Sequence, residues 1–105
     1  MSIIYMDNNA TTRIAPEVFE AMRPFLTENY GNPSSMYKFG AVAGAVVKEA
    51  RETVAGFLNA KESEIVFTSC GTESNNFAIR GILDAHPEKK HIVSTRVEHP
   101  AVLNT

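Results

Sequence analysis

The stretch from residue 65 to residue 76 constrains the fold more than any other part of this chain. A β-branched and aromatic run at 65–68 is followed by Ser69, Cys70 and Gly71, and a helical pattern begins directly afterwards. This order predicts a strand, a tight turn and the start of a helix. The first amides of a helix have no partner within it, and the helix dipole makes that end positive. The turn is therefore suited to a bound phosphate.

The residues of the turn also indicate which class of phosphate-containing ligand it suits. The turn lacks the lysine of a nucleotide-triphosphate loop and the three-glycine fingerprint of a dinucleotide fold. It therefore favours the single phosphate of a cofactor. From the residues alone one alternative stays open, in which Gly71-Thr72 is a plain strand-to-helix turn and Thr72 caps the helix.

The composition indicates an ordinary globular chain of one domain or less. Of its 105 residues, 44% are hydrophobic and 21% are charged, and the net charge is −2. No basic stripe is present to follow a nucleic-acid backbone or an anionic membrane, and no stretch approaches the roughly 20 apolar residues of a membrane span. A single cysteine cannot form an internal disulfide and no secretory signal is visible, so we expect a reducing, cytoplasmic setting.

Two helices are predicted in the first part of the chain. Pro16 stands where a first helical position is expected, and apolar residues follow at helical spacing as far as Leu26. Pro24 lies inside this pattern and predicts a kink or an interruption near Arg23. The longest helical pattern covers residues 39–58.

Glycines mark the loop at 30–35 and the long helix after it. Gly31 can supply a positive φ in the loop. Gly40 and Gly44 each weaken the helix by about 1 kcal/mol relative to alanine. We therefore expect a closely packed neighbour at these two positions.

A βαβ unit is predicted in the second part of the chain. A strand at 65–68, a helix from Thr72 to just before Pro87 and a second strand at 91–94 follow one another, and Pro100 opens another helix.

These elements are those expected at the front of a larger α/β protein. Residues 3–6 are an edge strand or an extended arm, and 7–12 are a polar turn before the first helix. We expect an N-terminal arm and helices in residues 1–60. In residues 61–105 we expect the incomplete start of a mainly parallel α/β domain.

Four stretches of the sequence point to one family. They are residues 5–12 (YMDNNATT), 30–35 (YGNPSS), 64–74 (EIVFTSCGTES) and 97–103 (VEHPAVL). In order and approximate spacing they resemble the N-terminal segment of the cysteine desulfurases, most of all the NifS-like branch. These are pyridoxal-phosphate enzymes of the class V aminotransferase family. The resemblance implies the aminotransferase fold type I, with pyridoxal 5'-phosphate as cofactor.

The resemblance assigns roles to three residues around the cofactor. At the positions of Gly71 and Thr72 the family binds the cofactor phosphate, through backbone N–H groups and the threonine hydroxyl. His99 matches the histidine that stacks on the pyridine ring and helps to move protons. Read without the family, a histidine before a proline at a helix start is more often structural. His86 and His91 have no match in the family pattern.

Further residues receive weaker assignments. Asn8, Ala10 and Thr11 correspond to a segment near the active-site entrance, where they help to shape the substrate site; the alternative for each is a hydrogen-bonded loop before a helix. Glu73 is assigned to helix-start electrostatics. The three histidines and Cys70 show no metal-ligand spacing, so no metal site is expected.

The sequence also departs from the family pattern. Many relatives have a histidine shortly after the loop at 30–35, where this chain has Met36-Tyr37-Lys38. The family places its cofactor-binding lysine and its nucleophilic cysteine beyond residue 105, and Cys70 does not match the persulfide-forming cysteine. The lysines without a matching context are Lys38, Lys48, Lys61, Lys89 and Lys90.

For the whole enzyme the resemblance implies conversion of L-cysteine to L-alanine, with sulfur passed to an enzyme persulfide and on to an iron–sulfur scaffold or another acceptor. It implies a homodimer, and we expect the 105 residues alone to be inactive. Two alternatives stay open. One is a related enzyme, a selenocysteine lyase or a serine-type aminotransferase. The other is a non-catalytic anion-binding module.

Overall fold

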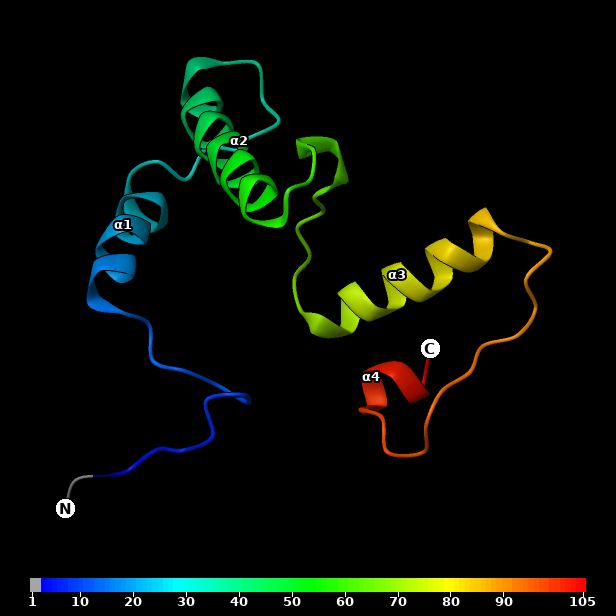
Figure 1. Ribbon diagram of the computed structural model, residues 1–105. Helices are drawn as coiled ribbons and strands as arrows, with labels where there is room; N and C mark the ends of the chain where they lie inside the picture. The colour runs from blue at the N-terminus through cyan, green and yellow to red at the C-terminus, as the bar shows by residue number, and fades with distance from the viewer. Residues whose placement is uncertain (1–2) are drawn as a thin grey trace. The chain divides into compact units, whose positions relative to one another are not determined.

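A computed structural model describes residues 3–105, and within that range every regular element is a helix (Figure 1). The elements are α1 (Pro16–Thr27), α2 (Lys38–Leu58), the short 3-10 helix η1 (Glu62–Glu64), α3 (Gly71–Ala85) and α4 (Pro100–Leu103). The chain divides after Ile65 into two compact units. The first contains α1, α2 and η1, and the second contains α3 and α4.

Helix α1 runs through Pro24 without the interruption predicted near Arg23. Pro24 opens the last turn of the helix, so only one turn lies beyond the hydrogen bond that the proline removes. Side chains support this end. The Thr27 hydroxyl donates to the Arg23 carbonyl at 2.9 Å, and Glu20 pairs with the Arg23 guanidinium at 2.9 Å.

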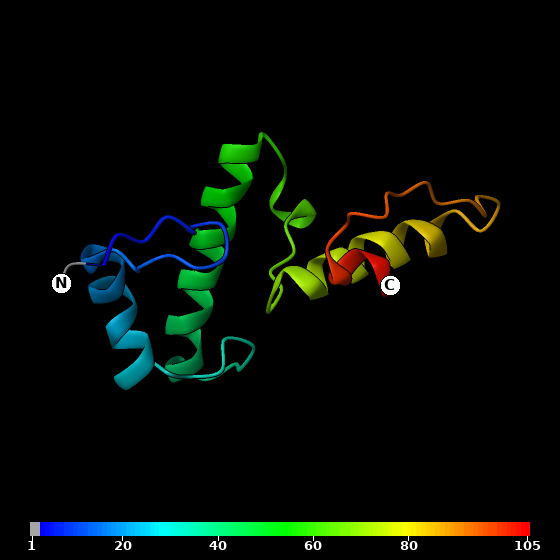
Figure 2. The same ribbon diagram turned by 90° about the horizontal axis from the view of Figure 1, so that it is seen from below.

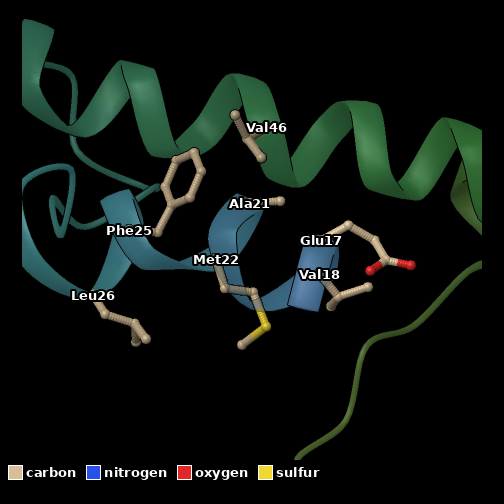
Figure 3. A pocket seen from close by; sticks show the side chains of 7 residues that line it. All are labelled: Glu17, Val18, Ala21, Met22, Phe25, Leu26 and Val46. Atoms are coloured by element: carbon tan, nitrogen blue, oxygen red, sulfur yellow. The ribbon is translucent and has the colours of Figure 1, made fainter. Parts of the chain in front are cut away.

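Helices α1 and α2 lie side by side in the first unit (Figures 1 and 2). An apolar groove runs along α1 where it faces Val46 of α2, and the Phe25 ring and the Val46 side chain both point into the space between the helices (Figure 3). The residues that line the groove are Glu17, Val18, Ala21, Met22, Phe25, Leu26 and Val46.

The long helix confirms the prediction for residues 39–58 and ends at Asn59, which takes the left-handed conformation with φ 51°. Its two N-terminal glycines lie against the preceding loop. A Cβ on Gly40 would be 2.4 Å from the Asn32 carbonyl oxygen, and one on Gly44 would be 2.9 Å from that of Pro33. The predicted close neighbour is thus confirmed, and it is backbone.

The prediction of a positive φ at Gly31 is wrong, because no glycine among residues 3–105 has one. A Cβ on Gly31 would lie 2.4 Å from the Phe39 carbonyl oxygen, so the position needs a glycine for close approach. The Tyr30 and Phe39 rings meet edge to face beside it, with centroids 5.2 Å apart.

The two strands predicted at 65–68 and 91–94 are absent, since the structure has no strand in residues 3–105. A strand is defined by ladder hydrogen bonds to a neighbour, and within this range neither segment has one. Only Ile65 is buried, and the Arg51 guanidinium donates to its carbonyl oxygen. Val93 is 98% exposed, as expected of a strand-like segment without its sheet.

The helices predicted in the second unit are confirmed. Helix α3 ends at Ala85, ahead of Pro87, and α4 opens at Pro100. The two helices are in contact, and both views draw α4 alongside the first half of α3 (Figures 1 and 2). No helix in the described part of the chain is long and apolar enough to cross a membrane.

Candidate functional site

The start of α3 presents backbone donors that the helix does not use. Cys70 is the N-cap in extended conformation, and the first intrahelical bond runs from the Ser74 amide to the Cys70 carbonyl at 3.1 Å. The amides of Gly71, Thr72 and Glu73 precede that bond. The donors predicted for a phosphate are therefore present.

The cap itself differs from the alternative raised by the sequence. Thr72 lies inside α3 and Cys70 is the N-cap, so the assignment of Thr72 as the cap is wrong. Two hydroxyls flank the turn and bond to each other: the Thr68 and Ser74 hydroxyl oxygens are 2.6 Å apart. The Ser74 hydroxyl also donates to the Cys70 carbonyl oxygen at 3.2 Å. Apart from its chain neighbours and the backbone of α3, nothing lies within 4 Å of a Cβ built on Gly71.

Glu73 confirms the helix-start role assigned to it. Its carboxylate accepts the Ser69 backbone N–H at 2.6 Å and the Ser69 hydroxyl at 2.7 Å. These two hydrogen bonds lower the pKa of the Glu73 carboxyl below its ordinary value. The carboxylate takes up the donors of Ser69 and leaves those of Gly71 and Thr72.

The Cys70 thiol is exposed and lies at the same helix end. The Glu73 amide, then the Ser69 hydroxyl and the Thr72 amide, lower the pKa of the thiol, while the Glu73 charge opposes the shift. The Ser69 hydroxyl oxygen is 3.8 Å from the sulfur. Amides that attract a thiolate attract other anions in the same way, which agrees with a phosphate site at this turn.

His99 is the N-cap of α4, the helix in contact with α3. Its Nδ1 accepts a hydrogen bond from the Ala101 amide at 3.0 Å. The structural role raised by the sequence is therefore present, and it leaves the other ring nitrogen, Nε2, available. The second unit thus contains Gly71, Thr72 and His99 on two touching helices.

The three residues predicted near the substrate entrance belong to the first unit. The Ala10 amide donates to the Asp7 carbonyl at 3.1 Å, the Thr12 hydroxyl donates to the Asn8 side chain at 3.0 Å, and the Tyr5 and Thr11 hydroxyls are 2.5 Å apart. This is the hydrogen-bonded loop that the sequence offered as the alternative. The role of Asn8, Ala10 and Thr11 at a substrate site stays a prediction.

Two residues of the site were missed by the sequence analysis. Ser69 supplies two donors to Glu73, and its signal is a small hydroxyl residue just before a helix with a carboxylate in the first turn. Ala101 acts through its backbone N–H, for which no side-chain signal exists. Across residues 3–105, no group of three or more His, Cys, Asp or Glu gathers in a way that holds a metal ion.

The donor set fits the phosphate of pyridoxal 5'-phosphate. The amides of Gly71 and Thr72 lie at the positive end of α3, the Thr72 amide beside the Cys70 thiol, and such donors suit a phosphate monoester.

Comparison with known proteins decides the family. The sequence pattern of class V aminotransferases matches residues 4–105. The chain belongs to the class V aminotransferase family. It is 65% identical over 104 residues to a cysteine desulfurase of Trichormus azollae and 53% identical over 105 residues to the cysteine desulfurase NifS of Azotobacter vinelandii. Each alignment covers 99% of this chain and 26% of the relative, so the chain spans about a quarter of these curated proteins.

The structure also resembles a solved member of this group. A NifS-like protein matches 96% of this chain and 28% of its own, with a TM-score of 0.86 and 44% sequence identity. The chain is therefore similar in structure to the corresponding part of this NifS-like protein, while its own residues 3–105 contain no strand. The resemblance inferred from the four sequence stretches is confirmed.

Proposed function

We propose that this chain is the N-terminal part of a pyridoxal-phosphate-dependent cysteine desulfurase. The observation on which the proposal rests is the identity of 65% and 53% to proteins named cysteine desulfurase. The donors at the start of α3 support it independently, since they suit the phosphate of the cofactor.

Each residue of the site has a task in this proposal. The amides of Gly71 and Thr72 and the Thr72 hydroxyl hold the phosphate, and the positive end of α3 adds to its binding. His99 would stack on the pyridine ring and hold a proton at Nε2. The cofactor, when bound, supplies an electron sink for the carbanion at the substrate α-carbon.

Sulfur transfer requires groups that we do not assign to this chain. In the proposed reaction an enzyme thiolate attacks the sulfur of L-cysteine and the carbon–sulfur bond breaks. Its electron pair goes to the carbon, which takes up a proton, so that L-alanine is released and the enzyme retains a persulfide. Cys70 is not that thiolate, and the lysines of this chain are not the cofactor-binding lysine. We therefore propose that residues 1–105 alone do not turn over.

The setting of the enzyme is also a proposal. We propose a cytoplasmic homodimer that passes sulfur to an iron–sulfur scaffold or another acceptor. The single free cysteine is consistent with a reducing setting, and relatives named NifS and IscS support the sulfur transfer. In the whole protein, segments 65–68 and 91–94 become neighbouring parallel strands of one sheet, a proposal that the match to a NifS-like structure supports.

The decisive experiment uses the full-length gene product. After addition of pyridoxal phosphate we expect a visible absorption band from a lysine imine, and with L-cysteine equal amounts of alanine and transferred sulfur. Pyruvate or another keto acid as the product would indicate a transaminase of the same family. Phosphate-dependent binding without an imine band would indicate a non-catalytic anion-binding module.

A further inference from the structure

The first turn of α4 closes around His99. The Val102 and Leu103 amides both donate to the His99 carbonyl, at 2.8 and 3.2 Å. Pro100 has no N–H, so the first amide available at this end is that of Ala101, which donates to His99 Nδ1 at 3.0 Å. Ala101 is 8% exposed, and its amide is shielded from water that would compete for the bond.

The direction of this hydrogen bond fixes the tautomer of the ring. A backbone amide can only donate, so Nδ1 must be the acceptor nitrogen and cannot hold a proton. In the neutral imidazole the proton is then on Nε2. A proton on Nδ1 would set two N–H groups against each other and break the bond to Ala101.

We propose that the Ala101 amide makes His99 a hydrogen-bond donor at Nε2 in the resting protein. The proposal rests on the role given to His99 in the proposed function and deepens it. Ala101 is a positioning residue that acts through His99. The ligand atom that Nε2 meets is therefore a hydrogen-bond acceptor, an oxygen, a sulfur or an unprotonated nitrogen.

A second histidine of the same unit, His86, provides an internal control, because its Nδ1 faces a hydrogen-bond acceptor instead of a donor. The Nδ1 of His86 lies 3.3 Å from the Glu88 carboxylate, which is an acceptor only. When that pair forms, Nδ1 of His86 must hold a proton. The two rings are thus expected to differ at the same nitrogen.

Nitrogen-15 spectroscopy of the full-length protein, prepared without cofactor, tests the tautomer. At alkaline pH we expect an unprotonated Nδ1 for His99 and a shift of the His86 Nδ1 toward the protonated value. We also expect a cross-peak through the hydrogen bond between the Ala101 amide and His99 Nδ1. His99→Gln assigns the signals by the one it removes.

An ester in place of the amide of Ala101 removes the donor with little change in shape. We expect the cross-peak to disappear and the His99 Nδ1 signal to move toward the protonated value. A protonated Nδ1 in the unmodified chain, or no change on the ester substitution, would overturn the proposal. The outcome is independent of the desulfurase assay, because a protein without turnover can show the tautomer and an active one can lack it.

Discussion

The Glu73 carboxylate accepts two hydrogen bonds from Ser69, one from the backbone N–H at 2.6 Å and one from the hydroxyl at 2.7 Å. The pair joins the end of the 65–68 segment to the first turn of α3, next to the amides that face the proposed phosphate. It fixes the turn by contacts local in sequence.

The first prediction concerns the pKa of Glu73, which these bonds lower. Ser69→Ala removes the hydroxyl donor and leaves the N–H, so we expect the pKa to rise part of the way toward its ordinary value. Carboxyl carbon shifts followed by NMR against pH measure it. Ser34→Ala, at a serine on a different loop, is the matched control and should leave Glu73 unchanged.

The same hydrogen bonds have a stability consequence with a definite sign. The folded-state pKa of Glu73 lies below its unfolded value, so the stabilisation is present at pH above the unfolded pKa and is lost as the pH falls through the folded pKa. The Ser69→Ala variant should thus unfold at a lower temperature than the parent at neutral pH. This difference in unfolding temperature should become smaller in acid. An unchanged pH dependence would contradict this.

The second prediction compares two glycines of α2. Gly40→Ala places a Cβ 2.4 Å from the Asn32 carbonyl oxygen, so we expect a loss of about 1–3 kcal/mol in the free energy of unfolding, typical of overpacking. Nothing lies within 4 Å of a Cβ on Gly56, and Gly56→Ala should stabilise by up to about 1 kcal/mol through helix propensity. Urea titration followed by circular dichroism measures both. Equal effects of the two substitutions would show that the loop at 30–35 is not in close contact with Gly40 in solution.

These comparisons also show what the sequence could predict. The helices were found because their signals are local: apolar spacing, and Pro16 and Pro100 at helix starts. The strands at 65–68 and 91–94 were not found in the structure, because a strand exists only through hydrogen bonds to a neighbour that no local pattern supplies.

The errors within the helical regions have the same origin. Whether Pro24 interrupts α1 depends on how few helical residues follow it. Whether Gly31 is required for a positive φ or for close approach of the backbone depends on the nearby Phe39 carbonyl. At the site, the start of a helix at Gly71 was predictable from residue types. The bond from the Ala101 amide to His99 was not, because a backbone donor leaves no trace in the sequence.

The third prediction tests the cofactor site. In the full-length protein, Thr72→Val removes a hydroxyl and keeps the size of the side chain. We expect pyridoxal-phosphate affinity to fall about tenfold or more, since a hydrogen bond to a charged group contributes about 1.5–3 kcal/mol. Thr72→Ser retains the hydroxyl and should keep most of the affinity. A titration unchanged by valine would remove Thr72 from the site.

The fourth prediction concerns the reactivity of Cys70, whose pKa is lowered by the Glu73 amide, the Ser69 hydroxyl and the Thr72 amide. The rate of alkylation by iodoacetamide should therefore reach half its maximum at a pH below that of an ordinary thiol. Glu73→Gln removes an opposing charge and should lower this midpoint further, whereas Ser69→Ala should raise it. Shifts in the reverse directions would contradict the assigned causes.

The last prediction separates this reactivity from catalysis. Serine is a favoured N-cap, so Cys70→Ser should keep the start of α3 and leave sulfur transfer in the full-length enzyme within about twofold of the parent. Alanine and persulfide formation from L-cysteine measure it, with the cofactor band recorded in the same preparation. Thr72→Val, which we expect to lose cofactor, is the positive control: it should show that the assay detects a damaging change at the start of α3. Loss of persulfide with an intact cofactor band would mean that Cys70 itself receives the sulfur, and the exclusion of this thiol from the reaction would be wrong.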